Sequence, residues 1–285
     1  MAKKIAIGLV CLLVVIIILI SLGNDTADKD TATQAEGTAA QPEGTAAQAA
    51  KFTLSENEKI AFSMLITEDI EMALKGKDSL FSEMSSEDIN IVTPDNLVRD
   101  YHANEVRANQ QYRGKPVAIT GRVDGIATGI TDRPYITFKT RELFSEPQAH
   151  FSRADSDKAA LVNRNQNLTL VCTGNGMVIG SPMLKDCQFF EDAVKTRVDK
   201  MMAEIPKLEK GRVKNVDEYV REMAWILKLA AISSDDFANC GDNITLKRLQ
   251  DAGKNIKKFE DLSNENKEKM QEYGEYLQIW SEVEE

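Results

Sequence analysis

Residues 112–126 read YRGKPVAITGRVDGI, and this stretch decides the fold of the central part of the chain. From Val117 to Gly125, apolar residues and glycines alternate with polar residues, which is the period of a strand with one buried face. Gly114 permits the tight turn that enters the strand. Gly121 and Gly125 allow the sharp bending that a small barrel requires. The stretch therefore predicts a long and strongly bent strand.

The sequence on either side of this strand supports a small barrel. Thr93 and Pro94 are typical of the N-cap and first position of a helix that leads toward the strand. After it, residues 135–139 and 168–172 again alternate with period two, and glycine, asparagine, aspartate and proline separate these runs. One helix followed by short strands predicts a small closed or partly closed β-barrel.

The flanks of this barrel read as helices, so the fold class is α+β. Ser55 and Glu58 form the pattern of a capping box at the start of a helix within 52–84. From Glu191 onward, helical periodicity returns and predicts a C-terminal helical domain. The predicted organisation is a signal anchor or signal peptide (1–23), a low-complexity tether (24–51), a helical segment (52–90), the barrel (91–190) and the helical domain (191–285).

The amino terminus predicts the compartment. Residues 5–22 contain 18 uncharged and mostly apolar residues, enough for a helix that crosses a bilayer. Lys3 and Lys4 precede them, so the body of the protein is expected to face outward. A cleaved signal peptide is the alternative, because the run ends in small residues near Gly23. Cys11 lacks the small-residue context of a lipoprotein cysteine and reads as a membrane-packing thiol.

The tether contains a tandem repeat, AEGTAAQ followed by PEGTAAQ, over residues 35–48. It has no leucine, isoleucine, valine or aromatic residue from Gly23 through Lys51, so burial cannot offset the entropy of ordering it. The composition predicts a flexible spacer.

Charge and motifs exclude several functions. The net charge of −10 disfavours bulk attraction to nucleic acid or anionic lipid. Only residues 91–190 are not acidic, with 12 basic against 10 acidic residues. No hydrolase, nucleotide-binding or zinc motif is present, so we expect no enzymatic activity, no metal and no cofactor. His102 and His150 lie outside any metal-ligand pattern and read as surface or hydrogen-bonded histidines.

Cys172 and Cys187 flank 14 residues rich in glycine, asparagine and proline. If this segment forms a β-hairpin, the two cysteines can face each other across adjacent strands, and an oxidising compartment would keep a disulfide. Two buried thiols and a metal pair are the alternatives. Cys240 is then left over, either as a buried free thiol or as a link between chains.

Four segments of the sequence resemble the tRNA-anti-like family of OB-fold proteins. They are YHANEVRA at 101–108, the stretch at 112–126, LTLVCTG at 168–174 and MLKDC at 183–187. The resemblance covers about residues 97–190. It implies a five-stranded OB-type barrel and an exported, often membrane-attached bacterial protein, and it implies no catalytic residues.

An OB-fold binds its ligands on one strand face and the adjoining loops. The residues near that zone, which are the ligand-binding candidates, are Arg122, Arg133, Tyr135, Phe138, Lys139 and Arg141. We expect a non-enzymatic, single-pass inner-membrane protein with its bulk in the periplasm or outside the cell, or a secreted periplasmic protein if the leader is cleaved. Its partner is expected to be an envelope protein, peptide or glycan. Single-stranded nucleic acid is the alternative, since basic and aromatic residues form such binding surfaces.

Overall fold

The computed structural model describes residues 52–129, 132–233 and 262–279, which form two compact units. The barrel unit comprises residues 66–200, and the helical unit comprises the described parts of 1–65 and 201–285. The barrel unit contains the second half of α2 (Glu56–Leu74), most of α7 (Phe190–Met202) and the elements between them. These elements are α3 (Leu80–Met84), β1 (Asn90–Val92), α4 (Pro94–Ala103), α5 (Glu105–Tyr112), β2 (Pro116–Thr128), β3 (Pro134–Phe138), β4 (Gln148–His150), η1 (Arg153–Asp155), α6 (Ser156–Ala160), β5 (Asn167–Val178) and β6 (Ser181–Phe189). The helical unit contains α8 (Ile205–Glu209), η2 (Val213–Asn215), α9 (Glu218–Ser233) and α11 (Asn264–Leu277).

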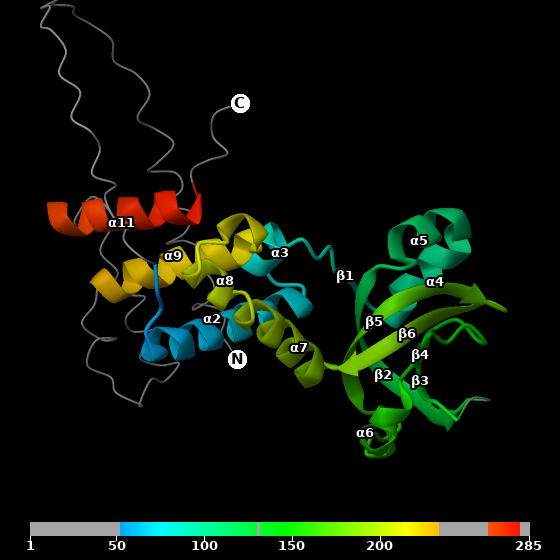
Figure 1. Cartoon of the computed structure of the whole chain (residues 1–285). Coiled ribbons are helices and arrows are strands. Elements are labelled where there is room, and N and C mark those ends of the chain that lie inside the picture. The colour runs from blue at the N-terminus through cyan, green and yellow to red at the C-terminus, as the bar shows by residue number, and fades with distance from the viewer. Residues whose placement is uncertain (1–51, 130–131, 234–261, 280–285) are drawn as a thin grey trace, which may run out of the picture. The chain divides into compact units, whose positions relative to one another are not determined.

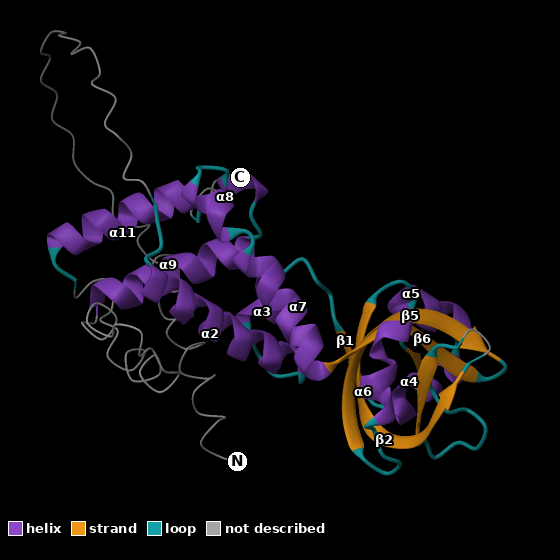
Figure 2. Ribbon diagram, turned by 60° about the horizontal axis from the view of Figure 1, so that its bottom comes forward, coloured by secondary structure: helices purple, strands orange, loops and turns teal. Residues whose placement is uncertain are grey.

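Five strands close into a ring in the order β2–β3–β4–β6–β5, and β5 returns to pair with β2 (Figures 1 and 2). All pairs in this ring are antiparallel except β4 with β6. The short strand β1 adds to β2 in parallel. This is a closed five-stranded barrel within an α+β fold, as the sequence predicted.

The long strand β2 closes the barrel because its two halves pair with different strands. Residues 116–122 pair with β5, and residues 123–128 pair with β3. A bulge between Val123 and Gly125 separates the halves, and such a bulge bends a strand and increases its twist. A Cβ on Gly121 would lie 2.4 Å from the Pro94 side chain, so only glycine allows α4 to approach β2 this closely.

The predicted helix before the barrel is two helices. Thr93 caps α4 as expected, accepting a hydrogen bond from the Asn96 amide at 3.3 Å. Asn104 then ends α4 and caps α5, because its side chain accepts from the Arg107 amide at 3.0 Å. The end of α5 lies directly on β5, where a Cβ on Gly174 would lie 2.0 Å from a backbone oxygen.

The helix predicted within 52–84 is also divided. Ser55 and Glu58 form the expected capping box, with amide-to-side-chain hydrogen bonds of 2.7 and 3.2 Å. The chain then leaves the helix after Leu74 and turns through Gly76, whose φ is +67°, before α3 begins.

The helical unit is held together around Phe52. Its ring packs against Tyr273 and Tyr276 of α11, with ring centroids 5.6 and 5.8 Å away. The Lys228 ammonium of α9, 5.7 Å from the centroid of the same ring, donates to both carboxylate oxygens of Glu58 at 2.7 and 2.8 Å. Ser263 caps α11, because its side chain accepts a hydrogen bond from the Asn266 amide at 3.3 Å.

In the described part of the chain, no helix combines the length and the apolar character that a bilayer span requires. The predicted leader (5–22) and tether (24–51), as well as Cys240, lie outside the described residues.

Candidate ligand-binding face

The barrel presents one continuous surface on the outside of β2, β3 and β4. Val123, Ile136 and Phe138 point into the core with no exposed surface, so their neighbours along the strands point outward. Cross-strand pairing sets Thr137 between Gly125 and Gln148, and sets Tyr135 between Ala127 and His150. We call this surface the outer face and define it by its outward residues, which are Arg122, Gly125, Ala127, Tyr135, Thr137, Lys139, Gln148 and His150.

A stacked pair of rings forms one row of this face. Tyr135 and His150 are both half-buried, with ring centroids 5.0 Å apart and planes inclined by 22°. The Nε2 atom of His150 is buried and has no hydrogen-bond partner in the described residues. Burial lowers the pKa of His150, which favours the neutral ring. On β2, the residues that pair with Thr137 and Tyr135 are Gly125 and Ala127, which carry little or no side chain.

Three basic side chains lie at the two ends of this face. Arg122 and Lys139 are exposed neighbours, since the Lys139 amide donates to the Arg122 carbonyl at 2.8 Å. Arg133 is exposed directly before β3. Within the described residues, none of the three lies within 4.0 Å of a carboxylate.

Two of the six predicted ligand residues lie elsewhere. Phe138 is fully buried in the barrel core, so its prediction as a ligand-contacting residue was wrong. The strand alternation that turns Tyr135 outward also turns Phe138 inward. Arg141 lies beyond β3, 3.6 Å from the Asp95 carboxylate, and its amide also donates to Asp95. The structure does not bring Arg141 to the ring pair.

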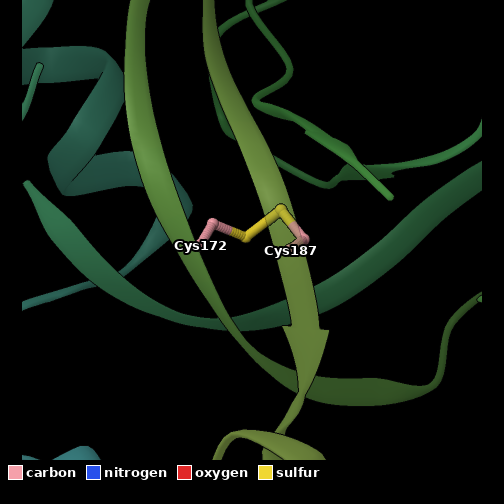
Figure 3. Close-up of a disulfide and its surroundings, with 2 residues drawn as sticks. All are labelled: Cys172 and Cys187. Carbon is pink, nitrogen blue, oxygen red and sulfur yellow. A yellow bond between two sulfur atoms is a disulfide. The ribbon is translucent and has the colours of Figure 1, made fainter. Parts of the chain in front are cut away.

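The predicted disulfide is present. Cys172 of β5 and Cys187 of β6 are bonded, with their Cα atoms 4.0 Å apart (Figure 3). Both residues are buried in the barrel core. The disulfide links the two strands of the β5–β6 hairpin. It excludes a metal pair at these two cysteines.

The described residues contain no group of three or more histidine, cysteine, aspartate or glutamate side chains that could hold a metal ion.

The sequence analysis missed three side chains of the outer face, Thr137, Gln148 and His150, of which His150 belongs to the ring pair. His150 was assigned to a surface or hydrogen-bonded role, but its Nε2 is buried without a partner in the described residues. The sequence pattern that could have placed His150 on this face is the alternation of Gln148 and His150 with the apolar Ala149 and Phe151, which are buried. β4 is only three residues long, and a period of two is weak evidence over so few positions.

Comparison with known proteins agrees with this topology. The model of the tRNA_anti-like family matches residues 1–188. The chain belongs to the tRNA_anti-like family.

A solved structure similar to this tRNA_anti-like chain is described as that of a candidate nucleic acid-binding lipoprotein from Klebsiella pneumoniae subsp. pneumoniae MGH 78578. It shares 18% sequence identity, with 35% of this chain and 91% of that chain covered, and the TM-score is 0.30. At that score, the likeness supports no inference about a ligand. The search of curated proteins found no match.

Proposed function

We propose that this chain is a membrane-tethered, outward-facing binding protein of the bacterial envelope, without enzymatic activity. Its outer face would bind a protein, peptide or glycan partner. The observation that carries the proposal is the Tyr135–His150 stack, which lies beside small residues and the hydrogen-bonding groups of Thr137 and Gln148. An aromatic surface with a few polar groups is suited to a sugar ring or a peptide side chain.

The location is supported by three features. The apolar run at 5–22 follows two lysines, and the spacer at 24–51 separates it from the first described helix. The buried Cys172–Cys187 disulfide fits an oxidising compartment. Alkaline phosphatase fused after Lys51 should be active in bacteria. An inactive fusion would place the body of the chain on the cytoplasmic side and end the proposal.

The ligand class can be read directly by crosslinking. A photo-reactive amino acid replaces Thr137 at the centre of the outer face in the full-length chain, expressed in cells. A matched variant carries it at Lys195, an exposed position on α7 outside the barrel. We expect adducts with protein or glycan from the Thr137 variant alone. Equal labelling from both positions would show that the outer face is not a binding site.

Single-stranded nucleic acid is the second candidate, because Arg122, Arg133 and Lys139 flank an aromatic stack without acidic partners among the described residues. It predicts that the full-length chain is retained on single-stranded DNA at low salt. Retention should fall steeply with salt and be lost in Arg122→Ala/Lys139→Ala. Lys195→Ala, whose ammonium pairs with Asp199 away from the face, is the control. No retention at low salt would remove this candidate.

A further inference from the structure

Four large apolar side chains of the barrel unit are exposed on two loops. Leu143 and Phe144 lie between β3 and β4 and are 82% and 84% exposed. Val178 and Ile179 lie at the β5–β6 turn and are 54% and 96% exposed. We call these two pairs the apolar tips. Single exposed apolar residues are ordinary on protein surfaces, whereas a cluster of them marks an interaction site.

The two tips are neighbours in space. A Cβ on Gly180 would lie 4.0 Å from the Phe144 carbonyl oxygen. His102, at the end of α4, joins the two loops: its Nδ1 is 2.6 Å from the Glu142 carboxylate, and its Nε2 is 3.4 Å from the Gly180 carbonyl oxygen. The four side chains therefore belong to one surface, at the end of β5 and β6 opposite to Phe189, where the chain leaves the barrel.

Both tips hold a bulky residue in a backbone conformation that favours glycine. Phe144 has a φ of +65° and Ile179 a φ of +48°. For a β-branched residue this conformation is rare and costs free energy. Because the Ile179 side chain is almost wholly exposed, it gains little from packing within the fold that would offset that cost.

The chemistry of the tips fits lipid better than a charged partner. Residues 165–184 contain no charged residue, and neither do residues 143–145. Basic side chains that would select an anionic surface are therefore absent from both tips. Apolar side chains on protruding turns lose their contact with water when they enter the soft interfacial layer of a bilayer.

The amino-terminal part of the chain would hold the folded part close to a bilayer. If residues 5–22 span or anchor in a bilayer, the 28-residue spacer at 24–51 separates the folded part from it by a random-coil distance of roughly 30 Å. So short a spacer gives the tips a high local concentration at the bilayer, so that even a weak contact between tips and lipid would form often.

We propose that the apolar tips insert into the interfacial layer of the bilayer to which the chain is tethered. The proposal rests on the tethered location proposed above. Since β3 leads directly into the first tip, this contact would orient the outer face relative to the membrane surface.

The test places a reporter in the first tip of the full-length chain. Phe144→Trp is reconstituted into phosphatidylcholine vesicles that carry brominated acyl chains, which quench tryptophan on contact. The unmodified chain supplies the background of the native tryptophans, and Lys195→Trp is the matched exposed control. We expect a blue shift and quenching for Phe144→Trp only, to the same extent when anionic lipid is added.

A second substitution separates insertion from other contacts. Adding Ile179→Asp, which alters an exposed side chain, should lower the ratio of inserted to free tips at least about tenfold, because an apolar side chain is lost from the bilayer and a charge is gained.

Three outcomes would overturn the proposal. The first is Phe144→Trp emission that stays unquenched in chains that float with the vesicles. The second is quenching that occurs only when anionic lipid is present. The third is a blue shift that depends on protein concentration and occurs without quenching, which would indicate contact with a second copy of the chain. Failure of the chain to float with vesicles would instead contradict the tethered location on which the proposal rests.

Discussion

In the barrel, the core is built from apolar and aromatic side chains and one disulfide, whereas the helical unit buries charged groups. Between residues 90 and 189 the buried polar residues that the structure describes are Ser145 and Ser181. In the helical unit, Glu58, Glu222 and Lys228 are each 8–9% exposed. The comparison suggests that a covalent bond and apolar packing set the stability of the barrel, while paired charges and pH set that of the helices.

The two units can be followed separately. Trp225 donates its indole N–H to the Met270 carbonyl at 3.2 Å, so its fluorescence reports unfolding of the helical unit. Amide hydrogen exchange in β2 and β5 reports opening of the barrel. Each prediction below expects one probe to respond and the other to stay constant.

The largest effect is expected at the buried ion pair. Glu58→Gln keeps the size of the side chain but leaves the Lys228 ammonium buried without its counter-charge. We expect a loss of about 3–5 kcal/mol in the free energy of unfolding of the helical unit. Glu56→Gln, two residues earlier, is the control, because its ion pair with Lys59 is exposed and contributes at most about 1 kcal/mol. Denaturant titrations followed by Trp225 fluorescence measure both variants. An equal loss of stability in Glu58→Gln and Glu56→Gln would show that burial does not increase the contribution of the ion pair.

The barrel should depend most on its disulfide. Cys172→Ala/Cys187→Ala removes a bond between residues separated by 15 positions, which the chain-entropy model equates with about 3 kcal/mol. We expect faster hydrogen exchange in β2 and β5 and an unchanged Trp225 transition. A shift of the Trp225 transition by the same amount would show that the two units unfold together.

The helical unit should also lose stability with rising pH. Burial, followed by the charge of Glu218, raises the pKa of Glu222 from 4.5 to about 7. The folded state therefore keeps a proton that the unfolded state releases above pH 4.5, so stability falls as the pH rises from 4.5 through 7.

Glu222→Gln should remove this loss. We expect a gain of up to about 3 kcal/mol at pH 8 and a much smaller change at pH 4. Glu275→Gln, on the exposed face of α11, is the control. A gain of equal size at both pH values would assign the effect to packing instead of ionisation.

The smallest effect is expected at the second apolar tip. Ile179→Gly relieves the left-handed backbone conformation and should stabilise the barrel by about 0.5–1 kcal/mol, while weakening vesicle contact. Val178→Gly, next to it in β5, has no such conformation to relieve and should destabilise the hairpin slightly. Denaturation of both variants, followed by hydrogen exchange in β5, measures the difference.

The barrel could be predicted from the sequence because its signals are local. The period of two in β2, the glycines that bend it, and the Thr93–Pro94 helix start each follow from a few adjacent residues and the steric limits of the backbone. The pairing of Cys172 with Cys187 was also within reach, because a glycine-rich connection favours a hairpin. The helix break at Asn104 was missed because apolar periodicity continues across it, from Leu97 to Tyr112. Near Gly76 the apolar stripe does end, at Leu74, but the sequence did not show that a separate helix, α3, follows.

The sequence by itself determined the strand alternation, the helix caps at Ser55 and Thr93 and the resemblance to the family, and it favoured a bond between Cys172 and Cys187. Only the tertiary structure decided which side of each strand faces outward, and so moved Phe138 into the core and His150 beside Tyr135. Only the tertiary structure also brought Phe144 and Ile179 to one surface and paired Glu58 with Lys228 across 170 residues. The physical reason is that alternation and capping depend on neighbours along the chain, whereas the inside of a closed barrel and the partner of a buried charge exist only after distant segments have packed.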